Sequence, residues 1–319
     1  MQNYSNIQKF LHDFVLSKKI INKSLFELEK LIYLKNRDIT NESHVFITGL
    51  PRSGTTALLY FFYSSNEFSS LTYNNMPFIL SPNFSKLIYK KNITKKKRLH
   101  GDAIDYDNNS PEALDEVFFN NDVEFVKNEL ANYIQLILFS NKKIRYLSKN
   151  NLNYKRIEFI HSILPNSIFL IPIREPLKHA YSLLKQHLNF TKLQKQDDFI
   201  KRYMSYLGHN EFGLHHKPWN NNINFKDLNK IDYWIEQWRL FYSYIYDKYK
   251  HKNNVHFVIY EKLNDINYIN IILKNINLEK NKNLKKNYFK KYNNEFDMKY
   301  DKNNYNKAKL IYGNFLRQA

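Results

Sequence analysis

The chain has 319 residues, of which 43% are hydrophobic, so it can form a sizeable core and is not a globally disordered protein. It has no cysteine, which excludes a disulfide scaffold and any thiolate metal site and fits a reducing compartment. The formal net charge of +19 attracts polyanions, but the excess is lysine spread among Asn, Ile and Tyr, so the charge alone decides little.

The composition also bears on targeting and domain number. The first 21 residues interleave polar with apolar positions and show no signal-peptide core. The longest apolar runs, such as 133–139, fall far short of the roughly 18 residues that a spanning helix needs. Glycine and proline are scarce, with 6 and 8 residues, so no flexible linker is visible. We expect a single cytoplasmic domain over residues 1–319 without a transmembrane segment.

The first half of the chain predicts a strand between helices. Apolar residues at helical spacing predict one or two amphipathic helices over 5–36. The run 44–48 predicts a short strand, followed by a Gly/Pro/Ser turn and a helix over 57–63. Residues 71–110 are predicted to be irregular because proline and glycine interrupt them. Ser110-Pro111-Glu112 then predicts a helix start, with serine as the N-cap and proline at the first helical position.

The second half predicts alternating helices and strands. An almost wholly apolar strand over 167–173 is typical of a central parallel strand. The pattern predicts further helices over 123–140, 177–187, 228–250 and 304–317, with strands over 143–147 and 255–260; the whole region 265–317 is expected to be helical. Such alternation predicts an α/β fold, with a central parallel sheet flanked by helices.

The turn after the first predicted strand is the most informative segment. It reads Gly49-Leu50-Pro51-Arg52-Ser53-Gly54-Thr55-Thr56. A loop that leaves a buried strand and opens a helix directs backbone N–H groups and the helix dipole at one point, where an anion binds. The Gly-x-x-x-x-Gly spacing matches a Walker A loop, but Thr55 stands where an NTPase has lysine, and the cation is the earlier Arg52. This loop favours a terminal phosphate-like group over ATP hydrolysis.

A second anion-binding segment follows the strand 167–173. Arg174 stands at the strand end, and Ser182 falls two turns into the next predicted helix, near the same crevice. Arginine offers a bidentate fork to phosphate. Taken alone, an arginine after a strand is more often a structural ion-pair residue, but two such motifs in this order at strand–helix junctions, more than 100 residues apart, argue against a coincidence.

These motifs resemble those of the sulfotransferases that use 3′-phosphoadenylyl sulfate (PAPS), whose fold is P-loop NTPase-like. Residues Pro51 to Thr56 look like the family's 5′-phosphosulfate loop, and Arg174 and Ser182 look like its 3′-phosphate motif. Cytosolic members usually carry lysine at Arg52, whereas tyrosylprotein sulfotransferases and many bacterial members carry arginine. The resemblance therefore points to a bacterial-type branch.

The resemblance extends over roughly residues 44–262. Shorter blocks include Ser148-Lys149-Asn150, Gly208-His209 and Tyr260-Glu261, and we expect Tyr260 among the nucleotide-binding residues. The glycine motif that closes over the nucleotide in cytosolic enzymes is absent. The resemblance implies transfer of a sulfuryl group from PAPS to an acceptor hydroxyl, with a glycan or glycolipid favoured, and no metal.

The resemblance also assigns Lys149 to the nucleotide's 5′ side, where it would stabilise the leaving phosphate. Cytosolic members have a histidine base two residues after this lysine, but this chain has Asn151, whose amide cannot accept a proton. Asn75 also replaces an acid that relatives carry. The base must come from elsewhere.

The base candidates lie in the segment 98–116. His100 and Asp102 are predicted in a loop, and Glu112, Asp115 and Glu116 in the first turns of a helix. We place His100 and Glu116 about equal, with Asp102 and Glu112 behind them. The acids of the helix can equally serve only to stabilise the helix dipole.

Other functions remain open at this point. A P-loop nucleotide kinase or NTPase is the alternative enzyme, disfavoured by Thr55. A nucleic-acid-binding protein is the alternative non-enzyme, motivated by the charge but without a recognisable reader motif. His209, His215 and His216 lack the surrounding motif of a known metal site. The sequence does not predict the acceptor or the oligomeric state.

Overall fold

The computed structural model describes residues 6–35, 37–88, 96–97, 105–280, 283–285, 288–290 and 298–318. Its centre is a five-stranded sheet in the order β2-β5-β1-β6-β7, in which every pairing is parallel. The strands are β1 (Val45–Ile47), β2 (Phe68–Ser69), β5 (Arg145–Lys149), β6 (Ile168–Ile173) and β7 (Val255–Ile259), with a separate two-stranded pair of β3 (Lys96–Lys97) and β4 (Asp105–Tyr106). The predicted α/β class with a central parallel sheet is confirmed.

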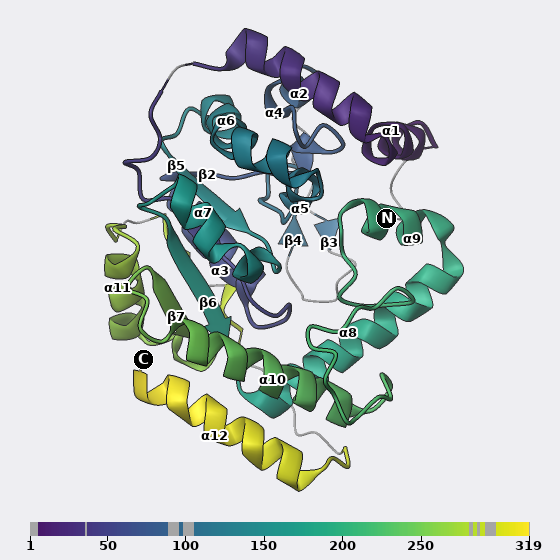
Figure 1. Ribbon diagram of the computed structural model, residues 1–319, viewed down its shortest axis with the longest axis vertical. Helices are drawn as coiled ribbons and strands as arrows, with labels where there is room; N and C mark the ends of the chain where they lie inside the picture. The colour runs from purple at the N-terminus through teal and green to yellow at the C-terminus, as the bar shows by residue number, and fades with distance from the viewer. Residues whose placement is uncertain are drawn as a thin grey trace.

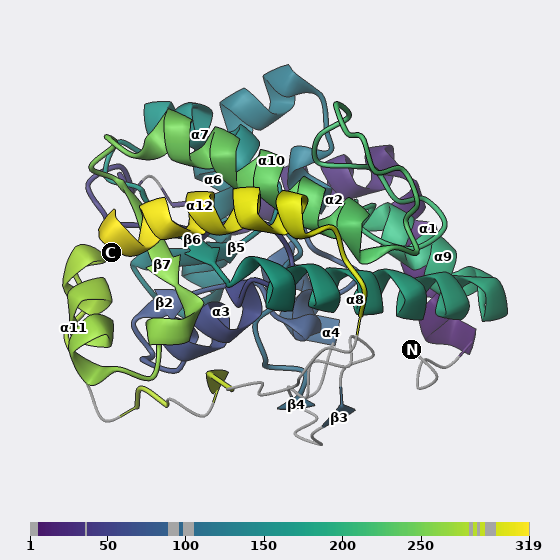
Figure 2. The same cartoon turned by 90° about the horizontal axis from the view of Figure 1, so that it is seen from below.

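Helices cover both faces of this sheet. Figure 2 shows α3 on one face and α7 and α10 on the other. The helices are α1 (Asn6–Ser17), α2 (Lys19–Tyr33), α3 (Thr55–Tyr63), α4 (Pro82–Ile88), α5 (Glu116–Phe119), α6 (Val123–Asn141), α7 (Ile157–Ile163), α8 (Pro176–Gln196), α9 (Asp198–Tyr206), α10 (Ile231–Tyr249), α11 (Ile266–Asn275) and α12 (Lys302–Gln318). Burial on both faces explains why β1 and β6 are apolar at every position rather than at alternate ones.

Aromatic side chains fill the core where α10 packs on α8 and α12 (Figure 1). Trp234, Trp238 and Tyr242 of α10 are fully buried. Each large ring removes much apolar surface from water, so this helix contributes heavily to stability. Its aromatic residues serve as core packing.

The order of the strands positions the site. β1 lies between β5 and β6, with Ile47 opposite Lys149 and Leu170. The carboxyl ends of these three strands therefore meet at one edge, beside the segment 48–56, Lys149 and the residues after Ile173. In parallel α/β sheets this is the edge where ligands bind.

The predicted helix start at Ser110-Pro111-Glu112 is wrong. Pro111 forms an isolated antiparallel bridge with Thr72, and the Glu112 backbone N–H donates to the Leu71 carbonyl at 3.0 Å. Helix α5 begins only at Glu116, with Asp115 as its N-cap residue. The tertiary bridge between Thr72 and Pro111 therefore overrides the local helix-capping pattern.

Among the described residues of the region 71–110, the structure has one α-helix, α4, that the sequence pattern did not predict. Pro82 opens α4 rather than breaking an element, because proline at the first helical position lacks only an N–H that would have no helical partner. Most other predicted elements agree with the structure to within a few residues, although α8 continues nine residues beyond its predicted end and α7 and α9 were not predicted. The expectation that the whole region 265–317 is helical is wrong, because α11 ends at Asn275, α12 begins at Lys302, and the described residues 276–280 and 298–301 between them are not helical.

Candidate active site

The loop between β1 and α3 has the backbone of an anion cradle. Three of its residues have positive φ: Gly49 at 128°, Arg52 at 67° and Gly54 at 109°. The Ser53 hydroxyl donates to the Leu50 carbonyl at 2.7 Å and closes the turn. The first N–H groups of a helix have no partner within it, so the start of α3 at Thr55 offers donors to a bound anion.

Tyr260 closes one side of this loop. A Cβ at Gly54 would come within 2.4 Å of the Tyr260 ring, so glycine is required by both the backbone angle and the close approach. Tyr260 directly follows β7, and its hydroxyl donates to the Lys290 carbonyl at 3.0 Å. The ring thus links the loop to the C-terminal part of the chain.

The two predicted anion-binding segments meet at Arg52. Its Nε donates to the Ser182 hydroxyl at 3.1 Å, and Nη1 of Arg174 donates to the Arg52 carbonyl at 3.4 Å. Arg174 is only 8% exposed, and its guanidinium lies 5.5 Å from the centre of the Tyr260 ring. Residues more than 120 positions apart in the chain therefore form one basic, hydroxyl-bearing site.

His179 supports the loop through a hydrogen bond to the loop backbone, a role that the sequence did not reveal. The ring is buried, and burial lowers its pKa to about 3, helped by the charges of Arg174 and Arg52. Its Nε2 lies 2.8 Å from the Pro51 carbonyl, which can only accept, so the neutral ring donates there. His179 therefore fixes the loop without adding charge.

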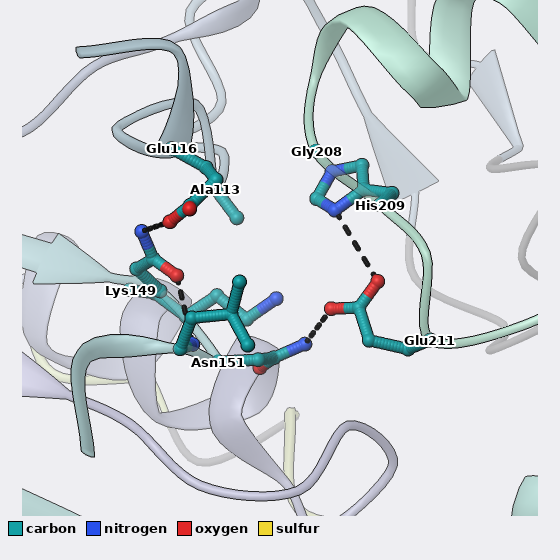
Figure 3. Close-up of a pocket in the computed structure, with 9 residues that line it drawn as sticks. Ala113, Glu116, Lys149, Asn151, Gly208, His209 and Glu211 are labelled. Carbon is teal, nitrogen blue, oxygen red and sulfur yellow. Dashed lines mark hydrogen bonds and ion pairs between the residues drawn. The ribbon is translucent and has the colours of Figure 1, made fainter. Parts of the chain in front are cut away.

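Lys149 ends β5 and opens onto a pocket beside the loop. It is 8% exposed. The pocket, called the Lys149 pocket below, is lined by Ala113, Glu116, Lys149, Asn150, Asn151, Leu152, Gly208, His209 and Glu211. Figure 3 shows Glu116 on one side of it and His209 and Glu211 on the other.

Glu116 lies in this pocket, but its carboxylate is held by a cation. Arg156 donates to both of its oxygens at 2.7 Å, and Asn150 adds a bond at 2.8 Å. A bidentate guanidinium pair engages both oxygens and fixes the orientation of the carboxylate. Glu116 is therefore placed to shape the pocket wall.

Glu112 and Asp115 are not among the residues that line the pocket. Glu112 accepts bonds from the Tyr73 hydroxyl and, at 2.9 Å, from the Ala113 N–H. Asp115 is fully buried beneath the pocket, where burial raises its pKa and the hydroxyls of Tyr146 and Ser148 donate to it. His100 and Asp102 lie outside the described residues.

Glu211 is a pocket residue that the sequence analysis missed. Its Oε1 accepts a bond from Asn151 at 3.1 Å, and its Oε2 lies 3.7 Å from Nδ1 of His209. Burial alone would raise the pKa of Glu211, but the interactions with His209 and Asn151 outweigh it and hold the pKa at about 2. Glu211 is thus an ionised, buried carboxylate.

The turn at Gly208 allows His209 and Glu211 to line the pocket. Its φ is 71°, and a Cβ there would lie 2.6 Å from Cγ of Glu116. The turn after α9 therefore packs directly on the first residue of α5. Only the Gly208-His209 pair, which forms part of the family resemblance, could have drawn attention to this segment.

Neither a cluster of metal-ligating side chains nor a membrane-crossing helix is present among the described residues. Within the ranges given above, no three His, Asp or Glu side chains come together as metal ligands would. In the same part of the chain, no helix combines the length and the apolar character that a membrane crossing requires.

Comparison with known proteins identifies the family. A model of the sulfotransferase family matches residues 44–217, which is more than half of the chain. No curated protein matches the sequence. Among solved structures, sulfotransferase STF1 from Mycobacterium tuberculosis H37Rv is similar with a TM-score of 0.52 at 12% identity, over 98% of this chain and 86% of that one. Sulfotransferase STF9 from Mycobacterium avium gives 0.51 at 11% identity, over 89% and 76%. At these identities the structures support the fold, while the family match supports the activity: the chain belongs to the sulfotransferase family and is a sulfotransferase.

Proposed function

We propose that this sulfotransferase takes its sulfuryl group from PAPS and transfers it to a hydroxyl of a glycan or glycolipid in the cytoplasm. The proposal of PAPS as the donor rests on one observation: the two anion-binding segments meet at Arg52. PAPS has phosphate groups on both sides of its ribose, so it needs two such segments close together. AMP and ATP lack the 3′-phosphate.

The residues present fit this donor. The backbone donors at the start of α3 and the Arg52 side chain would hold the phosphosulfate end, with Pro51, Ser53, Gly54, Thr55 and Thr56 forming the loop. Arg174 and Ser182 would hold the 3′-phosphate, and Tyr260 would lie beside the nucleotide. When bound, the donor supplies a sulfuryl group on a good leaving phosphate. Lys149 would place positive charge where that phosphate becomes more negative.

The acceptor class rests on the resemblance to bacterial members of the family. The Lys149 pocket is polar on both sides, with amide and carboxylate groups that can bond hydroxyls. A kinase or nucleic-acid-binding function has no comparable observation in its favour.

Ligand-induced stabilisation tests the donor. Adenosine 3′,5′-bisphosphate, the desulfated product, should raise the melting temperature without magnesium more than AMP or ATP at the same concentration. A ligand at a hundred times its Kd adds about 2.7 kcal/mol, which is an easily measured shift. Equal shifts with AMP would remove the case for a 3′-phosphate site.

Transfer of label tests the acceptor. Purified enzyme with radiolabelled PAPS is offered octyl β-glucoside, a neutral trisaccharide, a tyrosine peptide and p-nitrophenol. We expect the highest rate with one of the two sugars. A preference for the peptide or the phenol would contradict the proposed acceptor class while leaving the donor intact.

A further inference from the structure

Among the described residues that line the Lys149 pocket, one titratable side chain is suited by its contacts to act as a base. Three of its lining residues besides Lys149 can titrate: Glu116, His209 and Glu211. Glu116 is paired with Arg156 through both oxygens. Glu211 is ionised with a pKa of about 2, too low for an effective base near neutral pH. His209 remains, and an imidazole needs little tuning for that task.

The surroundings of His209 orient its ring. Nδ1 lies 3.7 Å from the Glu211 carboxylate, which can only accept, so this contact favours the tautomer with the proton on Nδ1 and the lone pair on Nε2. The carboxylate is in turn held by the Asn151 amide at 3.1 Å (Figure 3). Contacts of this kind are often long before substrate binds and tighten in the complex. The His209 side chain is 28% exposed, so substrate can reach it.

We propose that His209 is the general base of sulfuryl transfer and that Glu211 positions it, with Asn151 fixing the Glu211 carboxylate. This inference rests on the proposed function and deepens it. The assignment takes the base from the turn after α9 rather than from Glu112 or Glu116, while His100 and Asp102 lie outside the described residues.

The proposed step transfers the sulfuryl group and one proton in balance. Nε2 of His209 accepts the proton of the acceptor hydroxyl while that oxygen forms a bond to sulfur. The bond between sulfur and the phosphate oxygen of PAPS breaks, and its electron pair stays on the phosphate, for which Lys149 is the proposed cation. Glu211 stabilises the resulting imidazolium, as a buried carboxylate does when it faces a protonated ring. No oxidant, metal or further reactant is needed.

The first test compares matched substitutions by steady-state kinetics on the best acceptor of the panel above. His209→Gln should lower kcat by about 10²–10⁴, the usual loss on removing a general base. The Kd for adenosine 3′,5′-bisphosphate should stay within about threefold, because a base is not needed for nucleotide binding. His215→Gln, an exposed histidine of the same segment, is the control and should keep the wild-type rate.

Two further readouts separate chemistry from folding. Added imidazole should restore part of the activity of His209→Ala, which a purely structural loss would not allow. Glu211→Gln should move the low-pH limb of the kcat profile to lower pH, because a neutral amide no longer stabilises the imidazolium. The charged groups around His209 in this pocket, Glu116, Lys149 and Glu211, are otherwise unchanged in these variants.

The inference is overturned if His209→Gln retains activity within about threefold of wild type, or if Glu116→Gln or Glu112→Gln loses more activity than it does. An unchanged pH limb in Glu211→Gln would remove the positioning role alone. If the wild-type enzyme binds adenosine 3′,5′-bisphosphate no better than AMP and labels no acceptor, the proposed function itself fails, and this inference fails with it.

Discussion

The proposed nucleotide end of the site and the Lys149 pocket are built from different kinds of segment. The nucleotide end uses two strand–helix junctions, after β1 and after β6, and each carries a recognisable run of residues. The pocket combines the start of α5, the end of β5 and the turn after α9, so that residues such as Glu116 and Glu211 meet across 95 positions of chain. Under the proposed function, donor binding is thus encoded by local sequence motifs, whereas the acceptor side depends on tertiary packing.

The largest effect is expected from substitution of Lys149, which lies at the boundary between the two regions. Lys149→Ala should reduce kcat by about 10²–10³, as loss of a group that stabilises developing charge does. Affinity for adenosine 3′,5′-bisphosphate should change far less, because the charge matters most when the S–O bond breaks. Single-turnover kinetics and isothermal calorimetry measure the two. A loss confined to affinity would place Lys149 with the nucleotide end.

The Glu211 carboxylate should make the stability of the pocket depend on pH. Its pKa falls from an ordinary 4.5 to about 2 on folding, so its ionised form stabilises the folded state above about pH 4.5, and this contribution disappears as the pH falls toward 2. The shift corresponds to on the order of 3 kcal/mol. Urea unfolding of wild type and Glu211→Gln should differ more at pH 7 than at pH 3.5. An equal difference at both values would mean that the carboxylate is not charged in the fold.

Arg174 should act on the nucleotide end alone. Arg174→Ala should weaken binding of adenosine 3′,5′-bisphosphate by about 10–100-fold, since it removes a buried, charge-assisted bond to phosphate. AMP, which lacks the 3′-phosphate, is the internal control and should bind the variant as it binds wild type. If AMP binding falls equally, Arg174 holds the loop rather than the 3′-phosphate.

Ser182 should give the smallest effect. Ser182→Ala removes one hydroxyl and should cost about 1 kcal/mol, or roughly fivefold in affinity for the same bisphosphate. It also frees Nε of Arg52 from its bond to that hydroxyl. An unchanged affinity, measured by calorimetry, would indicate that Ser182 only orients Arg52.

The sequence predicted most of the fold because the sheet is buried on both faces. Its central strands read as short apolar runs, and β1 and β6 were recognisable from this alone. The helix start at Ser110 failed because the capping pattern says nothing about the Thr72 bridge that holds Pro111 extended. The roles predicted for the loop residues, Arg174 and Ser182 stay predictions, but the structure does bring these residues together.

The residues of the proposed acceptor side could not be predicted from local sequence patterns. His209 and Glu211 stand two positions apart in an irregular turn, a spacing with no periodic meaning. Their significance comes from Asn151 and from the close packing of Gly208 on Glu116, contacts between segments far apart in the chain. His179 was missed for the same reason, since its bond to the Pro51 carbonyl spans 128 positions.

The contact of Tyr260 with Gly54 has a practical consequence for dissecting this protein. A fragment trimmed to residues 44–217 would keep both anion-binding segments, yet it would lose α10, β7 and the ring that covers the loop. β6 would become a bare sheet edge, and the surface buried by Trp234 and Trp238 would be open to water. The stretch that relatives share is therefore shorter than the unit that can fold, and boundaries for expression should follow the packing rather than the homology.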